Sequence, residues 1–164
     1  MDNYDLNMNY FLQLNHDEFD KYLNAFVTKN KFKEILDLKD VDQREGMYML
    51  VLDEYNQVYI GMSNNIKRRI LEHWNSKKDF DRLLFGNKEN SIISIDSFGA
   101  LDTTRIFFKE LKWYQDINEQ EENIVSKFRK KYILNRVAGG INSEDNETIR
   151  NLKLMGSMKK RKLK

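Results

Sequence analysis

The 164-residue chain contains no cysteine. It therefore forms no disulfide and holds no metal through a thiolate, which favours a reducing compartment. It also lacks an apolar run long enough to span a bilayer, and its acidic, polar start, "MDNYDLNMNY", does not have the pattern of a secretory signal peptide. We expect a cytoplasmic protein with no membrane association.

What the chain does have is a composition typical of a folded domain, with 33% charged and 12% aromatic residues. Its length suggests one domain with a single core. Charge is distributed unevenly: residues 1–45 hold ten acidic and six basic side chains, a net of −4, so with +2 overall the remainder carries +6. This basic remainder permits contact with a polyanion, although a basic tail is also a common solvated end.

Hydrophobic periodicity predicts a small α+β fold with a mostly antiparallel three-stranded sheet flanked by helices. Helices are expected after a cap at Asn15 or Asp17, over Phe32–Leu36, after a cap at Ser63 or Asn64, and within 79–86 and 116–132. Strands are expected at 46–53, 57–61 and 91–98, and the segment 103–111 fits a strand at its start better than a helix.

Two tyrosines, Tyr48 and Tyr59, lie in consecutive predicted strands joined by a short turn. Side chains alternate between the two faces of an antiparallel hairpin, so an even-numbered loop places both phenols on one face. The four-residue loop "EYNQ" at 54–57 meets this condition, and an odd-numbered loop would separate the two phenols. Each tyrosine alone also fits an ordinary half-buried strand position.

The helix after this hairpin carries Asn65, Arg69 and His73 one turn apart, so that they share a face. Its neighbouring apolar stripe, expected to pack inward, consists of Ile66, Ile70 and Trp74. The polar stripe then lies near the edge of the sheet, where the tyrosines can meet it. Each polar residue alone also fits a solvated helix surface.

Glu121 has an unusual place in the last predicted helix, since it shares the apolar face formed by Ile117, Ile124, Val125 and Phe128. Burying a carboxylate is unfavourable unless it is paired or binds a cation. The adjacent Glu122 lies towards the polar side of the helix. Either a salt bridge, for example to Arg69, or a metal ion would satisfy Glu121.

Together these motifs resemble the GIY-YIG nuclease family. "GMY" at 46–48 and "YIG" at 59–61 match the two motifs after which the family is named, in the family's order and spacing. Arg69 follows Gly61 by eight residues, as the family's arginine does, and His73 matches a histidine found one helical turn later in homing and restriction members. The resemblance covers residues 46 to about 140.

The later part of the chain continues the match. Glu121 precedes Ile124 and Val125 at the spacing of the family's metal-binding glutamate, and Asn135 in "NRVAGG" matches an asparagine near glycines. The resemblance divides the chain into an N-terminal helical extension at 1–45, a GIY-YIG-like catalytic domain at 46–142 and a basic C-terminal tail at 143–164.

The resemblance implies a stand-alone, metal-dependent DNA endonuclease that hydrolyses phosphodiester bonds. In it Tyr48 is the base, Arg69 clamps the phosphate and Glu121 holds one divalent ion, Mg²⁺ or Mn²⁺. Tyr59 orients water or phosphate, and Asn135 braces the site. Two choices stay open: His73 in place of Tyr48 as proton acceptor or as a relay, and Glu122 in place of Glu121 as metal ligand.

Contacts with the DNA backbone are expected to be mainly electrostatic. The DNA-binding candidates are Ser63, Asn65, Lys67, Arg68 and Arg105, with the basic residues of 159–164. A homodimer is possible, because two strands need two cuts. Two alternatives remain: a catalytically weak nucleic-acid-binding module on the same fold, and a structure-specific nuclease for branched DNA.

Overall fold

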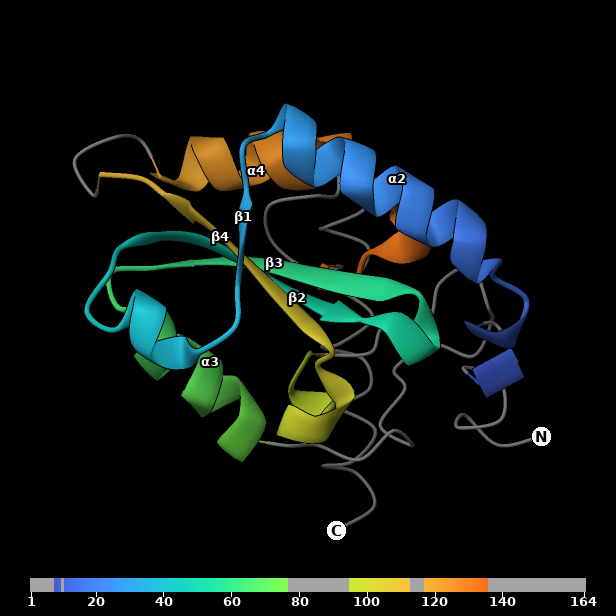
Figure 1. Ribbon diagram of the computed structural model, residues 1–164, viewed down its shortest axis with the longest axis horizontal. Coiled ribbons are helices and arrows are strands. Elements are labelled where there is room, and N and C mark those ends of the chain that lie inside the picture. The colour runs from blue at the N-terminus through green and yellow to red at the C-terminus, as the bar shows by residue number, and fades with distance from the viewer. Residues whose placement is uncertain (1–7, 10, 77–94, 113–116, 136–164) are drawn as a thin grey trace, which may run out of the picture.

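The computed structural model describes residues 8–9, 11–76, 95–112 and 117–135 (Figure 1). Within them, one antiparallel sheet has the strand order β1-β4-β2-β3. Its strands are β1 (Lys33–Ile35), β2 (Gly46–Leu52), β3 (Gln57–Ser63) and β4 (Arg105–Glu110). The helices are α2 (His16–Lys29), α3 (Ile66–Asn75) and α4 (Ile117–Lys127). The predicted α+β class is confirmed, with four strands rather than three.

Strands β2 and β3 form the predicted hairpin. Leu52 pairs with Gln57, so the four-residue loop is 53–56, one residue earlier than the predicted 54–57. Asp53–Tyr55 make a 3₁₀ turn and Asn56 takes a left-handed conformation with φ of 52°, a conformation that asparagine tolerates well. All seven residues of β2 are buried, because β2 lies between β4 and β3 and both of its faces are covered.

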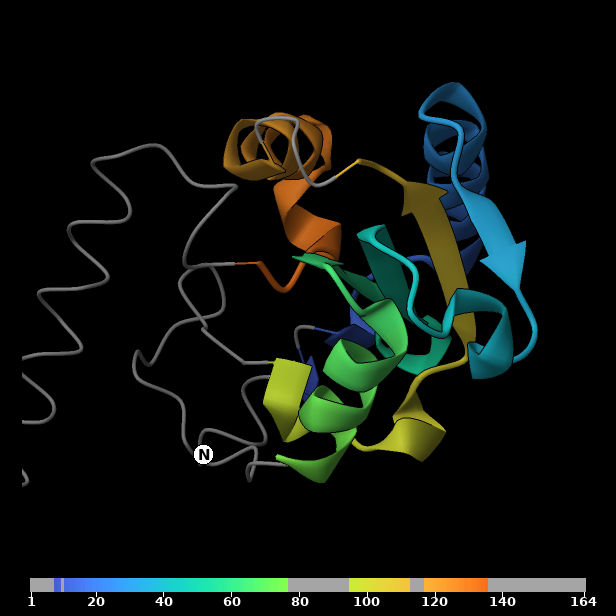
Figure 2. The same ribbon diagram turned by 90° about the vertical axis from the view of Figure 1, so that its left-hand side faces the viewer.

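Helices α2 and α4 lie on one face of the sheet and α3 on the other, as Figures 1 and 2 show, and each face carries its own hydrophobic cluster. On one face α2 and α4 pack against alternate residues of β2, namely Met47, Met49 and Val51. On the other face α3 packs against the residues between them, namely Tyr48, Leu50 and Leu52. The two-residue period of the strand thus decides which side chains of β2 face α3.

Helices α2 and α3 begin at asparagine caps. The Asn15 side chain accepts a hydrogen bond from the Glu18 amide, as one of the two predictions had it. The cap of α3 is Asn65, so the prediction of Ser63 or Asn64 was wrong. The predicted inner stripe of α3 is confirmed: Ile66 and Ile70 are fully buried, and Trp74 packs against the same cluster.

Strand β1 replaces a predicted helix over Phe32–Leu36. Lys31 has a φ of 60°, which turns the chain back after α2, and residues 33–35 pair with residues 106–108 of β4. Phe32 meanwhile enters the core cluster under α2. The helical tendency of this segment is outweighed by the backbone hydrogen bonds that an exposed sheet edge offers.

The strand predicted at 91–98 was also wrong where the structure describes it, because Ile95–Ser97 form a 3₁₀ turn. Ile95 and Phe98 are both buried, at 6% and 1% exposure, in the cluster beneath α3. Residues three apart share a side of a 3₁₀ turn, so this spacing buries both. Residues 91–94, the helix predicted within 79–86 and the tail at 143–164 lie outside the described residues.

Residues 16–35, from the predicted N-terminal extension, contribute α2 and β1 to this fold. No helix in the described ranges is both long and apolar enough to cross a membrane.

Candidate active site

Tyr48 and Tyr59 lie on the same face of the β2–β3 hairpin, as the even-numbered loop predicts. Tyr48 is opposite Gly61, and Tyr59 is opposite Leu50. The centroids of the two phenol rings are 6.2 Å apart. Both rings are directed to the side of the sheet that α3 covers.

Each of the two motif glycines, Gly61 and Gly46, occupies a position where a side chain would clash. A Cβ atom on Gly61 would lie 2.3 Å from the Tyr48 hydroxyl oxygen and 2.4 Å from Cζ. Gly46 has a φ of 146°, and a Cβ there would lie 2.2 Å from the carbonyl oxygen of Lys109. The glycine of each motif therefore admits close packing that a side chain would prevent.

Ser63 and Asn65 fix the start of α3. The Ser63 hydroxyl donates to the Asn65 carbonyl oxygen at 2.9 Å and accepts from the Asn65 amide at 3.0 Å. The Asn65 side chain in turn accepts from the Arg68 amide at 3.1 Å. These bonds set the direction in which α3 leaves the hairpin, and hence where its inner polar side chains lie.

His73 is the residue of α3 that meets the tyrosines. Its side chain is 4% exposed, and its Nε2 atom lies 2.8 Å from the Tyr48 hydroxyl oxygen. The imidazole also packs edge-on against Tyr59, with ring centroids 5.1 Å apart. The Nδ1 atom lies 2.8 Å from a carboxylate oxygen of Asp96, a residue absent from the sequence-based prediction.

The pKa values in this cluster follow from burial. Burial and the neighbouring Tyr59 raise the pKa of Tyr48 far above the ordinary value, and the Arg69 charge only partly offsets this. Burial, with the Glu121 charge second, raises the pKa of Tyr59 to about 12. Burial lowers the pKa of His73, although its hydrogen bond to Asp96 opposes this. At neutral pH both phenols are protonated and the imidazole is neutral.

Arg69 lies one turn before His73 on α3. Its guanidinium donates a 2.9 Å hydrogen bond to Glu72, and its side chain is 46% exposed. The hydrogen bond to Glu72 raises the pKa of Arg69, and the nearby hydroxyls of Tyr48 and Tyr59 act in the same direction. Arg69 is therefore a permanent positive charge that borders the tyrosines and still reaches solvent.

Glu121 belongs to α4, which packs on the other face of the sheet and contacts the edge strand β3. Burial raises the pKa of its carboxyl, while the Arg69 charge lowers it and the Glu122 charge raises it. The Glu121 charge in turn raises the pKa of Tyr59 and, to a smaller extent, that of Tyr48, so it acts electrostatically on both phenols. Among the described residues, no hydrogen bond or ion pair engages Glu121, and Glu122 is exposed.

The Asn135 side chain is hydrogen-bonded to the backbone of Ile60, the middle residue of the "YIG" motif in the edge strand β3. Its side chain accepts from the Ile60 amide at 2.9 Å and donates to the Ile60 carbonyl oxygen at 2.6 Å. The preceding residues continue this pairing, since the Leu134 amide donates to the Val58 carbonyl oxygen at 2.8 Å. Asn135 thereby fixes the backbone between Tyr59 and Gly61.

A protein-family model, the GIY-YIG catalytic domain, matches residues 44–133, more than half of the 164-residue chain. The chain belongs to the GIY-YIG family. The resemblance drawn from the two motifs is thus confirmed, and the chain carries a nuclease domain of this family. Searches of curated proteins and of solved structures found no match.

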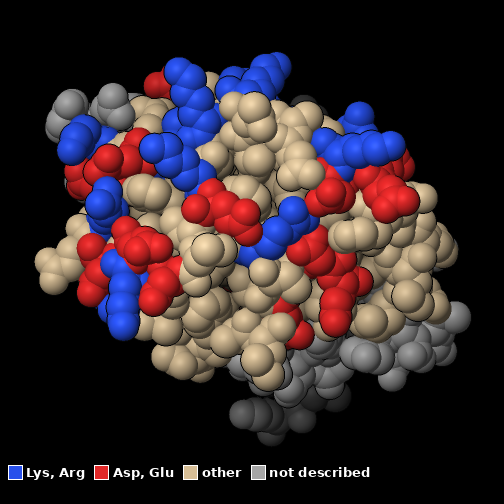
Figure 3. All heavy atoms as spheres, viewed as in Figure 1, with Lys and Arg blue, Asp and Glu red and all other residues tan. Residues whose placement is uncertain are grey.

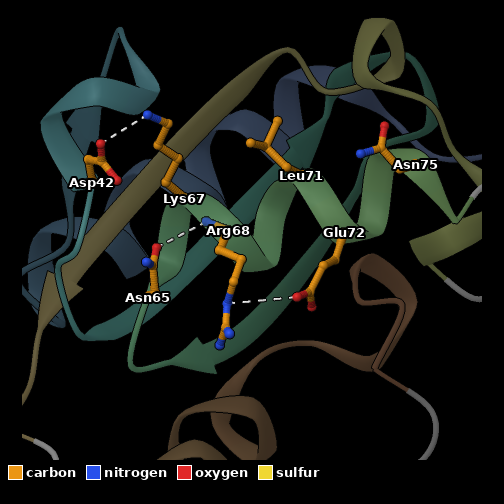
Figure 4. A pocket seen from close by; sticks show the side chains of 7 residues that line it. All are labelled: Asp42, Asn65, Lys67, Arg68, Leu71, Glu72 and Asn75. Atoms are coloured by element: carbon orange, nitrogen blue, oxygen red, sulfur yellow. Dashed lines mark hydrogen bonds and ion pairs between the residues drawn. The ribbon is translucent and has the colours of Figure 1, made fainter.

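In this GIY-YIG domain the basic residues predicted to contact DNA, Lys67, Arg68 and Arg105, lie on different surfaces. Lys67 and Arg68 line a groove of about 340 Å³ on the outer side of α3, together with Asp42, Asn65, Leu71, Glu72 and Asn75 (Figure 4). Lys67 pairs with Asp42 at 3.0 Å, and Arg68 lies 3.8 Å from Glu72. Both cations therefore already have acidic neighbours.

Arg105 lies on the other face of the sheet. It is opposite Val51 in β2, and its guanidinium is bonded to Asp53 at 2.6 Å and Asp20 at 2.9 Å. These two ion pairs tie β4 to the hairpin loop and to α2. The structure does not bring Arg105 to the tyrosines.

Proposed function

We propose that this GIY-YIG domain is a metal-dependent endonuclease that hydrolyses phosphodiester bonds of DNA. The observation that carries the proposal is the 2.8 Å contact between the Tyr48 hydroxyl and Nε2 of His73. Arg69 and Glu121 act electrostatically on both tyrosines, one supplying a cation and the other a carboxylate. A phosphate diester and an attacking water need this combination of groups.

The proton path starts at water. Because the pKa of Tyr48 is raised, its phenolate is not populated near pH 7, and Tyr48 acts as a base only by giving up its own proton. His73 Nε2 lies at hydrogen-bond distance to receive it. The attacking water then transfers a proton to the Tyr48 oxygen as the phenolic proton moves to His73. Tyr48 and His73, between which the sequence left the proton acceptor open, thus act together in this proposal.

Tyr59 is the more accessible of the two phenols, since Tyr48 is 1% exposed and Tyr59 is half-buried. Water therefore reaches the pair from the side of Tyr59. We assign Tyr59 to orienting that water, with its hydroxyl protonated throughout. Asn135 supports this arrangement by holding the adjacent Ile60 backbone.

Arg69 is the proposed phosphate clamp. A guanidinium presents a planar set of N–H donors that matches two oxygens of a phosphate, and negative charge on these oxygens grows during attack. Glu72 occupies one of these donors in the structure. A bound phosphate therefore has to displace Glu72 or share Arg69 with it.

Glu121 fits a divalent cation by its donor chemistry. It is a half-buried carboxylate with a raised pKa and, in the described chain, no hydrogen-bond or ion-pair partner, which an Mg²⁺ or Mn²⁺ ion would satisfy. No group of three or more acidic or histidine ligands occurs in that part of the chain. A single carboxylate suffices for Mg²⁺, which keeps several waters and takes other ligands from substrate phosphate. When bound, the ion stabilises negative charge on the leaving oxygen.

For the DNA path we propose the side of β3 and α3. The opposite edge of the sheet, at β1, faces the viewer in Figure 3 and has basic and acidic side chains interspersed, so it presents no uniform charge to a polyanion. We assign Lys67 and Arg68 on α3 to phosphates that flank the one held by Arg69. Asn65 acts indirectly by capping α3, and Ser63 by holding the backbone of Asn65. Arg105 is not part of the proposed interface.

The deciding experiment is cleavage of supercoiled plasmid DNA with Mg²⁺ or Mn²⁺ by the wild type and by Glu121→Gln. The matched control is Glu122→Gln, which changes the adjacent, exposed carboxylate. We expect nicked and linear DNA from the wild type and the control, and a loss of at least about 10²-fold in rate for Glu121→Gln. A wild type that binds DNA without cutting would instead identify a binding module. Cutting confined to branched substrates would identify a structure-specific nuclease.

A further inference from the structure

Asp96 is the outermost member of a chain of hydrogen bonds that leads to Tyr48. Its carboxylate oxygen lies 2.8 Å from His73 Nδ1, and His73 Nε2 lies 2.8 Å from the Tyr48 hydroxyl. The three residues come from η3 (Ile95–Ser97), α3 and β2. The family motifs in the sequence do not include Asp96, and the order of the chain does not suggest this contact.

The contact with Asp96 determines where the imidazole carries its hydrogen. An ionised carboxylate only accepts hydrogen bonds, so the ring nitrogen that faces it, Nδ1, must be the donor. A neutral imidazole has one N–H, which leaves Nε2 as an acceptor. Nε2 therefore accepts the hydrogen bond from the Tyr48 hydroxyl and is ready to take that proton.

The polypeptide around Asp96 holds the carboxylate in place. Ile95 and Phe98, on either side of it, are buried beneath α3, and the Phe98 ring packs edge-on against Tyr55. Further along, the Trp74 indole donates a 3.1 Å hydrogen bond to Thr103, which ties α3 to the same segment. The side chain of Asp96 is only 24% exposed. The carboxylate is therefore fixed relative to α3, and water competes little with His73 for its hydrogen bond.

We propose that Asp96 is a positioning residue of the nuclease, which locks His73 in the tautomer with hydrogen on Nδ1 so that Nε2 can accept the Tyr48 proton. It also stabilises the imidazolium that forms when the proton arrives. Three charged groups act on His73: Asp96 directly, with Arg69 and Glu72 from α3. Of these, Asp96 bonds to the ring itself. The inference rests on the proposed function, but the tautomer can be observed without any DNA.

The test uses Asp96→Asn, which keeps size and shape but replaces an acceptor-only group with an amide. The amide can present N–H to Nδ1 and thereby favours hydrogen on Nε2, which blocks that atom as an acceptor. The chain has two histidines, so long-range ¹H–¹⁵N spectra of the full-length protein show two imidazole patterns, and a His16→Gln variant assigns them. We expect hydrogen on Nδ1 of His73 in the wild type and a shift towards Nε2 in Asp96→Asn.

Cleavage is measured in parallel over a range of DNA concentrations that reaches saturation. Asp96→Asn should lower kcat by roughly 10²-fold with little change in KM, because the substrate is bound but proton removal is impaired. Asp102→Asn is the matched control: Asp102 accepts from the Gly99 amide at 2.6 Å in the same segment but does not contact His73. It should leave both the tautomer and kcat as in the wild type.

The proposed nuclease function and the proposed role of Asp96 can be refuted independently of each other. A wild type that cuts no DNA would refute the proposed function, and the tautomer comparison would still decide whether Asp96 positions His73. Hydrogen on Nε2 in the wild type, or an Asp96→Asn variant with unchanged tautomer or unchanged kcat, would overturn the role of Asp96. Thermal unfolding midpoints within a few degrees of the wild type confirm that the variants are folded.

Discussion

The phenol of Tyr48 occupies the space that a side chain at position 61 would need. Tyr48 and Gly61 are directly opposite each other in the β2–β3 ladder, and a Cβ on Gly61 would lie 2.3 Å from the Tyr48 oxygen. The same oxygen lies 2.8 Å from His73 Nε2. Gly61 therefore leaves free the space that the Tyr48 hydroxyl needs for its hydrogen bond with His73.

This relationship predicts that Gly61→Ala separates Tyr48 from His73. The added methyl group forces the phenol to move, and overpacking of this kind destabilises a protein by about 1–3 kcal/mol. Cleavage should fall by at least 10-fold even though no reacting group is removed, because a small displacement is enough to break a catalytic hydrogen bond. Single-turnover rates and urea unfolding measure the two effects. Wild-type cleavage by a folded Gly61→Ala protein would contradict the proposed role of the Tyr48–His73 contact.

Tyr48→Phe removes the hydroxyl and keeps the ring. We expect a fall of about 10²–10⁴-fold in cleavage, the usual contribution of a general base. The matched control is Tyr22→Phe on α2, where the hydroxyl bonds to the Arg129 amide and the Lys127 carbonyl on the far face of the sheet. That variant should lose about 1 kcal/mol of stability and no activity. Equal activity of Tyr48→Phe and the wild type would exclude Tyr48 as the base.

Glu121→Gln tests the carboxylate through stability alone. Because burial raises the folded-state pKa of Glu121 above the unfolded value, the stability gained from its neutral form is complete at low pH and is lost as pH rises through the folded pKa. In metal-free buffer the variant should therefore be more stable than the wild type at pH 7.5, with the difference vanishing below about pH 4.5. Thermal melts across this pH range make the comparison.

The same pair of proteins reports metal binding. If Glu121 holds Mg²⁺ with a Kd of about 1 mM, 10 mM Mg²⁺ stabilises the wild type by about 1.4 kcal/mol and Glu121→Gln by little. Glu122→Gln should respond as the wild type does. An equal response from Glu121→Gln would assign the metal to other residues.

Glu72→Gln should strengthen DNA binding. Glu72 accepts a hydrogen bond from Arg69 at 2.9 Å and lies 3.8 Å from Arg68, so it competes with phosphate for both cations. Removing its charge should raise affinity by about 3–10-fold at low salt and steepen the dependence of log Kd on log salt. Fluorescence anisotropy with a labelled duplex, in Ca²⁺ in place of Mg²⁺, measures this. A weaker complex would show that Glu72 orients Arg69 rather than competing for it.

The sequence alone determined the features that depend on local period and spacing. The four-residue loop, the two-residue alternation of strands and the 3.6-residue turn of a helix place Tyr48, Tyr59, Ile66 and Ile70 on definite faces whatever lies around them. The place of Glu121 on the apolar side of α4 follows from the same periodicity, and the structure shows it half-buried. For the same reason the GIY-YIG motifs are visible without coordinates.

Only the tertiary structure decided which distant groups meet. The partners of Asp96, Asn135 and Arg105 lie 23, 75 and up to 85 residues away along the chain, and no local pattern encodes such contacts. The strand at Lys33–Ile35 likewise exists because β4 offers it an edge, against the helical tendency of the segment. Burial by the whole fold also sets the pKa of Tyr48, since the cost of ionising a phenol depends on everything that excludes water from it.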